Sequence, residues 1–148
     1  MANDPKPHCD FDSSQLILRL TFTVPGDVNA ISPVVDGVMH IAKQMECAKG
    51  KEFEVEIAVR EALANAIIHG CKSDAGKTVQ VCVACDTSRG ILIVVRDPGR
   101  GFEPAKVASP TAGQNVFSDH GRGIYLINEL MDAVHYERGG TEIRMMKK

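Results

Sequence analysis

The sequence predicts an α/β (α+β) two-layer sandwich: a mixed, mostly antiparallel sheet with helices on one face. Short apolar segments come in pairs joined by tight turns, which indicates β-hairpins. Longer segments with helical periodicity lie between these pairs and need an apolar surface to cover. The chain has 148 residues, of which 44% are hydrophobic and 24% charged. This length and composition are typical of a single globular domain with a core of its own.

The first elements follow from simple local patterns. Residues 15–24 alternate apolar and polar side chains, as in a strand with one buried face. Ser32-Pro33 is a helix start, with Ser32 as the N-cap, and this helix is expected to run to about residue 47. Residues 1–14 are expected to form a mobile tail and residues 15–148 the domain. The remaining elements, after the central helix, are expected as strands at 78–86 and 91–96, a helix at 121–131, and a hairpin of 132–137 and 141–147.

The central helix is expected at residues 52–71, which contain no Pro and are rich in Ala, Leu, Glu and Arg. Helical spacing groups a set of apolar residues on one side, the expected core face: Phe53, Ile57, Ala64 and Ile68, with Leu63 and Ile67 beside them. Glu61, Asn65 and His69 follow one another at i, i+4 and i+8 and share another face. Their neighbours on that face are the small residues Ala58, Ala62 and Ala66. This leaves room for a ligand, although a polar stripe satisfied by nearby backbone would show the same pattern.

Composition excludes several classes of function. The formal net charge is -2, which disfavours direct nucleic-acid binding. No apolar run approaches the length of about 18 residues that a membrane span needs. The N-terminal residues lack an apolar signal core, so a cytoplasmic protein is expected.

Two short motifs do not have their usual meaning here. Gly76-Lys77-Thr78 resembles the end of a P-loop, but Cys71 stands where the first Gly is required and a helix precedes the motif. Cys82 and Cys85 form a CxxC on a predicted strand, where residues three apart point to opposite faces, so a zinc site is disfavoured. The odd count of five cysteines argues against a disulfide framework, and reduced thiols fit the cytoplasm.

Two glycine-rich segments could bind a nucleotide. Asp97-Pro98-Gly99-Arg100-Gly101 follows an apolar strand, so a carboxylate at the strand end could accept a hydrogen bond from a ligand amino group. Gly121-Arg122-Gly123 begins a predicted helix, where free N–H groups and the helix dipole favour phosphate. Each segment has a plain structural alternative, as a capped turn and as a hinge.

Taken in order, these segments resemble the GHKL superfamily of histidine-kinase-like ATP-binding domains. The similarity rests on Glu61 to Gly70, on Asp97 to Phe102, on Gly121 to Ile124 and on Gly140-Thr141, and it covers residues 15–147. A short domain in which the Glu-containing motif ends in His-Gly is most similar to the anti-sigma factor serine kinases of partner-switching systems. The resemblance implies a Bergerat-type ATP-binding fold.

The resemblance also implies roles for individual residues. Glu61 would be the catalytic base, and Asn65 would hold Mg²⁺ on the phosphates of ATP. Asp97 would accept from the adenine amino group. The other implied contacts are Thr141 through water, Gly99 and Gly101 along the nucleotide, Gly121, Arg122 and Gly123 at the phosphates, and residues 102–120 as a lid. His69 belongs to the resemblance but is interpreted as a structural residue that closes the helix.

The implied function is that of an ATP-dependent serine/threonine-protein kinase acting as an anti-sigma factor. Its partners would be a sigma factor and a small antagonist protein that it phosphorylates, and a homodimer is compatible with this branch. Two alternatives stay open: a nucleotide-gated binding protein with little kinase activity, and an ATP-binding module of another regulator. A histidine kinase proper is disfavoured, because no phosphoacceptor helix precedes the domain.

Overall fold

The computed structural model describes residues 16–86, 88–99 and 119–148, and in this part of the chain it has one sheet of five strands. The spatial order is β1-β2-β3-β5-β4, and every neighbouring pair is antiparallel. The strands are β1 Leu16–Pro25, β2 Thr78–Asp86, β3 Gly90–Arg96, β4 Ala133–Glu137 and β5 Glu142–Lys147. The predicted sandwich is therefore confirmed, and no parallel pair occurs among the described strands. The predicted tail at 1–14, most of the predicted lid at 102–120, and Gly101 lie outside the described residues.

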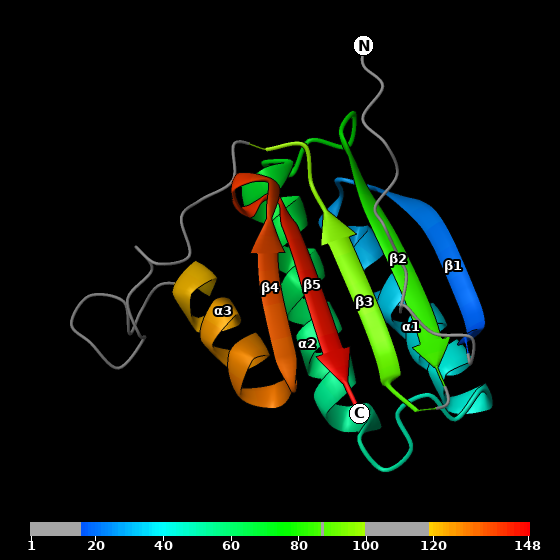
Figure 1. The fold of residues 1–148 in the computed structure, drawn as a ribbon. Helices are drawn as coiled ribbons and strands as arrows, with labels where there is room; N and C mark the ends of the chain where they lie inside the picture. Colours follow the sequence, from blue (N-terminus) through cyan, green and yellow to red (C-terminus); the bar gives the residue numbers. More distant parts are fainter. Residues whose placement is uncertain (1–15, 87, 100–118) are drawn as a thin grey trace.

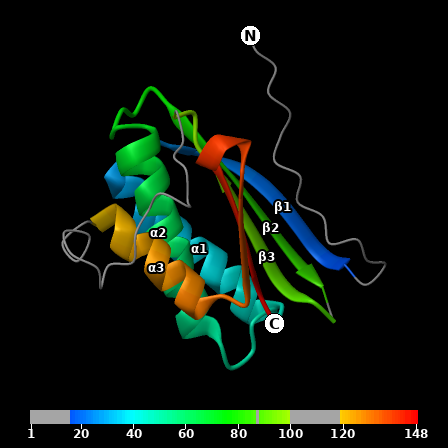
Figure 2. The ribbon, with the colours of Figure 1, turned by 60° about the vertical axis from the view of Figure 1, so that its left-hand side comes forward.

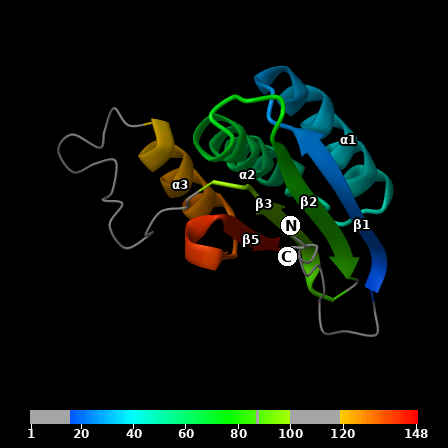
Figure 3. The ribbon, with the colours of Figure 1, turned by 90° about the horizontal axis from the view of Figure 1, so that it is seen from above.

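All the long helices lie on one side of this sheet (Figures 1 and 2). They are α1 Ile31–Gln44, α2 Glu52–Asn65 and α3 Asp119–Leu130. Seen from above, α2 lies between α1 and α3 (Figure 3). Three short turns complete the described fold: a 3-10 turn at Val28–Ala30, a π-helical turn at Ala66–Gly70 and a 3-10 turn at Arg138–Gly140. Among the described residues, no helix is long and apolar enough to cross a membrane.

The core lies between the sheet and the helices, and strand register determines which side chains enter it. Val81 pairs with Val95, Val95 with Ile143, and Ile143 with Tyr136. Directly opposed residues of a sheet point to the same face, so these side chains form one row on the helix side. Val81 and Val95 are fully or almost fully buried, and Ile143 is 8% exposed.

The buried face of α2 differs from the predicted one. The helix packs against the core through Val55, Ala58, Val59, Ala62 and Leu63, followed in the π turn by Ala66 and Ile67. Leu63 and Ile67 were predicted to be buried and are. Phe53 and Ile68 were predicted to be buried but are 74% and 44% exposed. The prediction was wrong because α2 is apolar on two opposite sides, and periodicity does not show which of them faces the sheet.

The start of α1 also differs from its prediction. Asp27 caps the preceding 3-10 turn by accepting a hydrogen bond from the Asn29 N–H at 2.9 Å. The chain then continues into α1 with Ala30 in the cap position, and Ala30 makes no side-chain cap. Ser32 is the second residue of the helix, where its hydroxyl accepts from Arg60 Nη1 at 3.0 Å and links α1 to α2.

The cysteines are not all reduced, contrary to the prediction. Cys47, after α1, and Cys85, on β2, form a disulfide with a Cα–Cα distance of 5.6 Å. Cys71 is a free, buried thiol. The expected alternation within the CxxC is confirmed: Cys85 lies in the core under the helices, whereas Cys82 lies with a small apolar cluster on the other face of the sheet.

Candidate functional site

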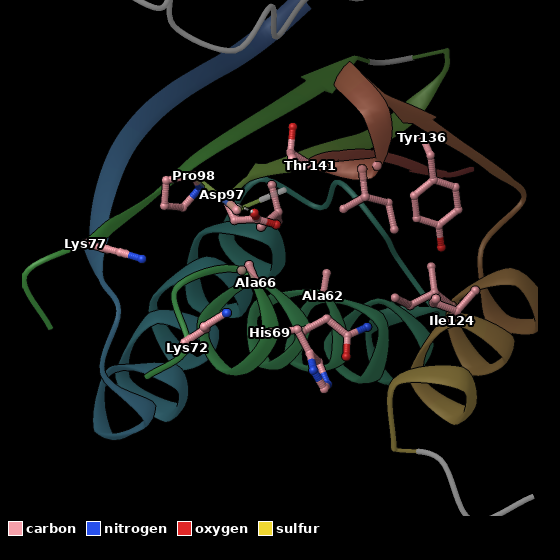
Figure 4. Close-up of a pocket in the computed structure, with 17 residues that line it drawn as sticks. Ala62, Ala66, His69, Lys72, Lys77, Asp97, Pro98, Ile124, Tyr136 and Thr141 are labelled. Atoms are coloured by element: carbon pink, nitrogen blue, oxygen red, sulfur yellow. Dashed lines mark hydrogen bonds between the residues drawn. The ribbon is translucent and has the colours of Figure 1, made fainter. Parts of the chain in front are cut away.

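A cavity with a volume of about 550 Å³ lies between α2 and the β3–β5–β4 side of the sheet. Figure 4 shows Asp97, Pro98 and Thr141 on its sheet side and Ala62, Ala66 and His69 on α2 and the π turn. Tyr136 and Ile124 lie at the opposite end from Lys72 and Lys77 (Figure 4). A cavity of this size suits a nucleotide-sized ligand, because ligand pockets are usually about 300–1,000 Å³. The remaining lining residues are Asn65, Gly70, Val95, Gly99, Ile127, Gly140 and Ile143.

Beside Asp97 and Thr141, the sheet side of the cavity has an apolar row that ends in a phenol. Val95, Ile143 and Tyr136 come from neighbouring strands in one cross-strand row. A flat apolar ring could lie against the aliphatic part of this row. Burial raises the pKa of Tyr136 to about 12, so its hydroxyl stays protonated at neutral pH.

Two hydrogen bonds hold Asp97 directly after β3, one through its backbone N–H and one through its carboxylate. Its N–H donates to the Thr141 carbonyl at 2.9 Å, and its Oδ1 accepts from the Gly99 N–H at 2.7 Å. Burial raises the pKa of the Asp97 carboxyl, and the hydrogen bond from Gly99 partly opposes that shift. A part-buried carboxylate with a fixed backbone is suited to accept a directional hydrogen bond from a ligand.

Two glycines allow the carboxyl of Asp97 to lie close to the end of the α2 segment. A Cβ on Gly70 would lie 2.5 Å from Asp97 Oδ1 and 2.6 Å from Asp97 Cβ. A Cβ on Gly99 would lie 2.9 Å from the same Oδ1 and 2.9 Å from the Gly70 carbonyl oxygen. No side chain fits in either place without moving Asp97. The glycines of the two motifs therefore make this contact possible, in addition to any contact with a ligand.

Glu61 and Asn65 converge beneath the second turn of α3. A Cβ on Gly123 would lie 3.0 Å from Glu61 Oε2, 3.0 Å from Asn65 Nδ2 and 3.3 Å from Asn65 Oδ1. One point in space is thus within contact distance of a carboxylate and an amide, and only a glycine leaves that point open. A carboxylate and an amide carbonyl are oxygen donors of the kind that Mg²⁺ accepts alongside phosphate oxygens and water. These side chains therefore fit the implied ion.

The helix that carries this pair changes its geometry at Asn65. There α2 ends and a π turn begins, and the Cys71 N–H donates to the Ala66 carbonyl at 2.8 Å. Single π turns are common at functional sites. The predicted regular spacing of His69 behind Asn65 is therefore not kept, although the exposed His69 still lines the cavity.

The predicted phosphate-binding segment starts differently from its prediction. The helix was expected to begin at Gly121, but α3 begins at Asp119. Gly121 and Arg122 are consequently in the first turn, where N–H groups have no partner within the helix, and Gly123 is in the next turn. The side chain of Arg122 lies outside the description.

Three polar cavity residues were not found from the sequence, in addition to the apolar Val95, Ile127 and Ile143. Lys72 and Lys77 line the cavity from the loop after the π turn, and Tyr136 lines it from β4. Lys72 has a positive φ of 52°. Two lysines within the seven residues after the Glu61 motif were a possible signal for an anionic ligand. Tyr136 had no such signal, because its place in the cavity depends on the pairing of β4 with β5.

Comparison with known proteins identifies the class. Residues 24–147 match the model of the histidine kinase-like ATPase domain. This match covers the described fold from the end of β1 onward, and it includes every predicted site residue. The chain belongs to the histidine kinase-like ATPase domain family, and ATP is its ligand, as the motifs had predicted.

Two relatives place the chain more closely. It is 35% identical over 116 residues to the anti-sigma F factor of Clostridium acetobutylicum, covering 75% of this chain and 80% of the relative. It is 33% identical over 115 residues to the serine-protein kinase RsbW of Bacillus licheniformis, covering 72% of this chain and 71% of the relative. Both names belong to the branch that the motifs had indicated, so the predicted resemblance is confirmed.

Proposed function

We propose that this protein is an ATP-dependent serine/threonine-protein kinase that also acts as an anti-sigma factor. The observation that carries the proposal is the convergence of Glu61 and Asn65 beneath Gly123, beside a cavity whose sheet side carries Asp97. This arrangement provides a base and a place for phosphate on the helix side, and a hydrogen-bond acceptor for a purine on the sheet side. The substrate would be a small antagonist protein, and the sequestered partner a sigma factor.

The nucleotide would lie along the cavity with its adenine at Asp97. The adenine amino group would donate to the Asp97 carboxylate, and its ring would contact Val95 and Ile143 on the sheet. Thr141 is close by, because its carbonyl accepts from the Asp97 N–H. The phosphates would extend toward Asn65 and the first turn of α3, whose free N–H groups favour anions.

Glu61 would prepare the phosphate acceptor. A serine hydroxyl of the antagonist would lose its proton to the Glu61 carboxylate as its oxygen bonds to the γ-phosphorus of ATP. The bond from that phosphorus to the bridging oxygen would break, and ADP would leave. Such a base typically contributes about 10²–10⁴-fold to the rate, while positioning and charge neutralisation supply most of the rest. Mg²⁺, held by Asn65, would supply that neutralisation when bound.

The test is single-turnover phosphate transfer from Mg-ATP to the co-encoded antagonist. Glu61→Gln keeps the shape and hydrogen bonding of the side chain but cannot accept the proton. We expect its transfer rate to fall at least ~100-fold while ATP binding stays within a few-fold of the wild type. Glu129→Gln, a carboxylate on the exposed side of α3, is the matched control and should transfer normally.

A slow wild type would favour the alternative function. If wild-type and Glu61→Gln proteins transferred phosphate equally slowly, the protein would be a nucleotide-gated binding protein, and Glu61 would have a structural role. We also propose that the protein works in the cytoplasm, where its sigma factor and ATP occur. A homodimer is compatible with both functions, and sedimentation analysis would test it.

A further inference from the structure

A buried ion pair lies directly behind the part of the cavity that carries Asp97. Arg96 Nε donates to Glu142 Oε1 at 2.9 Å, and Arg96 Nη2 lies 2.9 Å from the same oxygen. The two side chains are only 10% and 3% exposed. Val95 and Ile143 line the cavity, and successive strand residues point to opposite faces of a sheet. The ion pair therefore lies on the face away from the helices, close to the nucleotide site without lining it.

This ion pair stands at the end of the ladder between β3 and β5. Arg96 is the last residue of β3, Glu142 is the first of β5, and the two are directly opposed. The next residues outward are Asp97 and Thr141, joined by the hydrogen bond from the Asp97 N–H to the Thr141 carbonyl at 2.9 Å. Both of these residues line the cavity. A shift of the ladder at Arg96 therefore passes to Asp97 through a single peptide unit.

Stability alone does not explain an ion pair at this place. A buried ion pair loses about as much in desolvation as it gains in attraction, so well-packed apolar side chains are often equally stable. Apolar residues do occupy the neighbouring part of this face, where Leu92 and Val94 are 3% and 0% exposed. The ion pair adds direction, because the planar guanidinium of Arg96 holds the carboxylate through two donors in one geometry. Arg144 Nη1, 3.6 Å from Glu142 Oε2, orients the same carboxylate from its other oxygen.

We propose that Arg96 and Glu142 are positioning residues for adenine recognition, an inference that rests on the proposed function. Their ion pair fixes the end of β3 against β5, so that the Asp97 carboxylate is aimed at the amino group of adenine. On the cavity side, Gly70 and Gly99 approach the same carboxylate closely. Asp97 is thus held from both faces of the sheet, and the ion pair acts on ATP through Asp97 without contacting the nucleotide.

This arrangement predicts an effect on a single contact of the nucleotide. Purine riboside 5′-triphosphate has the ring, ribose and phosphates of ATP but lacks the amino group that would donate to Asp97. A displaced carboxylate weakens the binding of ATP and leaves the binding of this analogue unchanged, whereas a general loosening of the fold weakens both. The ratio of the two affinities therefore separates a positioning role from a structural one.

The experiment measures the affinity of the protein for both nucleotides by calorimetry in the presence of Mg²⁺. Arg96→Met combined with Glu142→Leu replaces the whole pair, so that neither buried charge is left without its partner. We expect this double variant to bind ATP roughly 10-fold more weakly, as for the loss of one hydrogen bond to a charged group. Its affinity for the analogue should stay within two-fold of the wild type.

The matched control is a salt bridge at the other end of β5, where Lys147 Nζ lies 3.5 Å from Asp132 Oδ1. Lys147→Met combined with Asp132→Leu should leave both affinities unchanged. In an Asp97→Ala background, replacing the Arg96–Glu142 pair should cause no additional loss of ATP affinity, because the contact that it supports is already absent. If the double variant does not fold, Glu142→Gln takes its place, since the amide keeps the shape and the acceptor oxygen. This single variant should weaken ATP binding about 3-fold more than binding of the analogue, because the hydrogen bond is no longer charge-assisted on the acceptor side.

The outcomes separate this inference from the proposed function. Equal losses for ATP and the analogue, or ATP affinity of the double variant within two-fold of the wild type, would overturn the positioning role but leave the kinase proposal standing. An additional loss in the Asp97→Ala background would overturn it as well. A wild type that binds ATP no more tightly than the analogue would instead refute the adenine contact of Asp97 in the proposed function, and this inference with it.

Discussion

A methyl group added at Gly70 should remove most of the ATP affinity, although Gly70 has no side chain of its own to contact ATP. In Gly70→Ala, the new Cβ would lie 2.6 Å from Asp97 Cβ and 2.5 Å from Asp97 Oδ1. Carbon atoms in good contact are about 3.5–4.0 Å apart, so one partner must move by roughly 1 Å. We expect Asp97 to move, because its side chain can rotate, whereas Gly70 is part of the backbone of the π turn.

The size of the effect follows from what Asp97 would lose. Its N–H is bonded to Thr141 and its Oδ1 to Gly99, so a 1 Å displacement would break at least one of these bonds or turn the carboxylate away from the adenine. A hydrogen bond to a charged group is worth about 1.5–3 kcal/mol. ATP affinity should therefore fall roughly 10- to 100-fold, since about 1.4 kcal/mol corresponds to ten-fold.

Calorimetric titration with Mg-ATP measures this loss, and thermal unfolding of the same samples shows that the domain is intact. Gly37→Ala is the matched control, because a Cβ on Gly37 would meet no atom within 4 Å and the residue lies on the exposed side of α1. That variant should bind ATP normally and be more stable by about 0.5–1 kcal/mol. ATP affinity of Gly70→Ala within two-fold of the wild type would refute the argument that Gly70 positions Asp97.

Two further predictions concern pH and redox conditions. Since burial raises the pKa of Asp97, the folded protein binds more protons than the unfolded chain above the ordinary value of 3.8, and stability contributed by this group falls as pH rises through the raised pKa. Asp97→Asn should thus gain stability relative to the wild type as pH rises from 3.8 through the raised pKa, and thermal unfolding that shows no pH dependence of the difference would contradict the shift. Reducing the Cys47–Cys85 disulfide, whose sequence separation is 38 residues, should lower stability by about 4 kcal/mol in the chain-entropy model. A phosphine reductant should lower the melting temperature by roughly 10 °C and affect Cys47→Ala less, whereas an equal response of both proteins would argue against this pairing.

The sequence predicted those site residues that lie within recognisable motifs. Glu61, Asn65, Asp97 and Thr141 were each expected near a ligand, and the structure places Asn65, Asp97 and Thr141 on the cavity and Glu61 beside Asn65. The contact of Gly70 with Asp97 was not predictable, because it joins the end of a helix to the end of a strand. Tyr136 was missed for the same reason, since only strand pairing brings β4 beside β5.

By itself, the sequence determined the order, type and approximate bounds of the described elements. Hairpin turns, period-two strands and Ala-rich helical runs are local signals, and every predicted strand and helix after residue 15 has a counterpart in the described fold. The tertiary structure decided which side of α2 is buried. Because α2 is apolar on two opposite sides, periodicity alone favoured Phe53 and Ile68, while the sheet contacts the side of Val55, Val59 and Ala62. It also decided the pairing of Cys47 with Cys85 and the approach of Gly123 to Glu61 and Asn65, because residues distant in the chain meet only when the helices pack on the sheet.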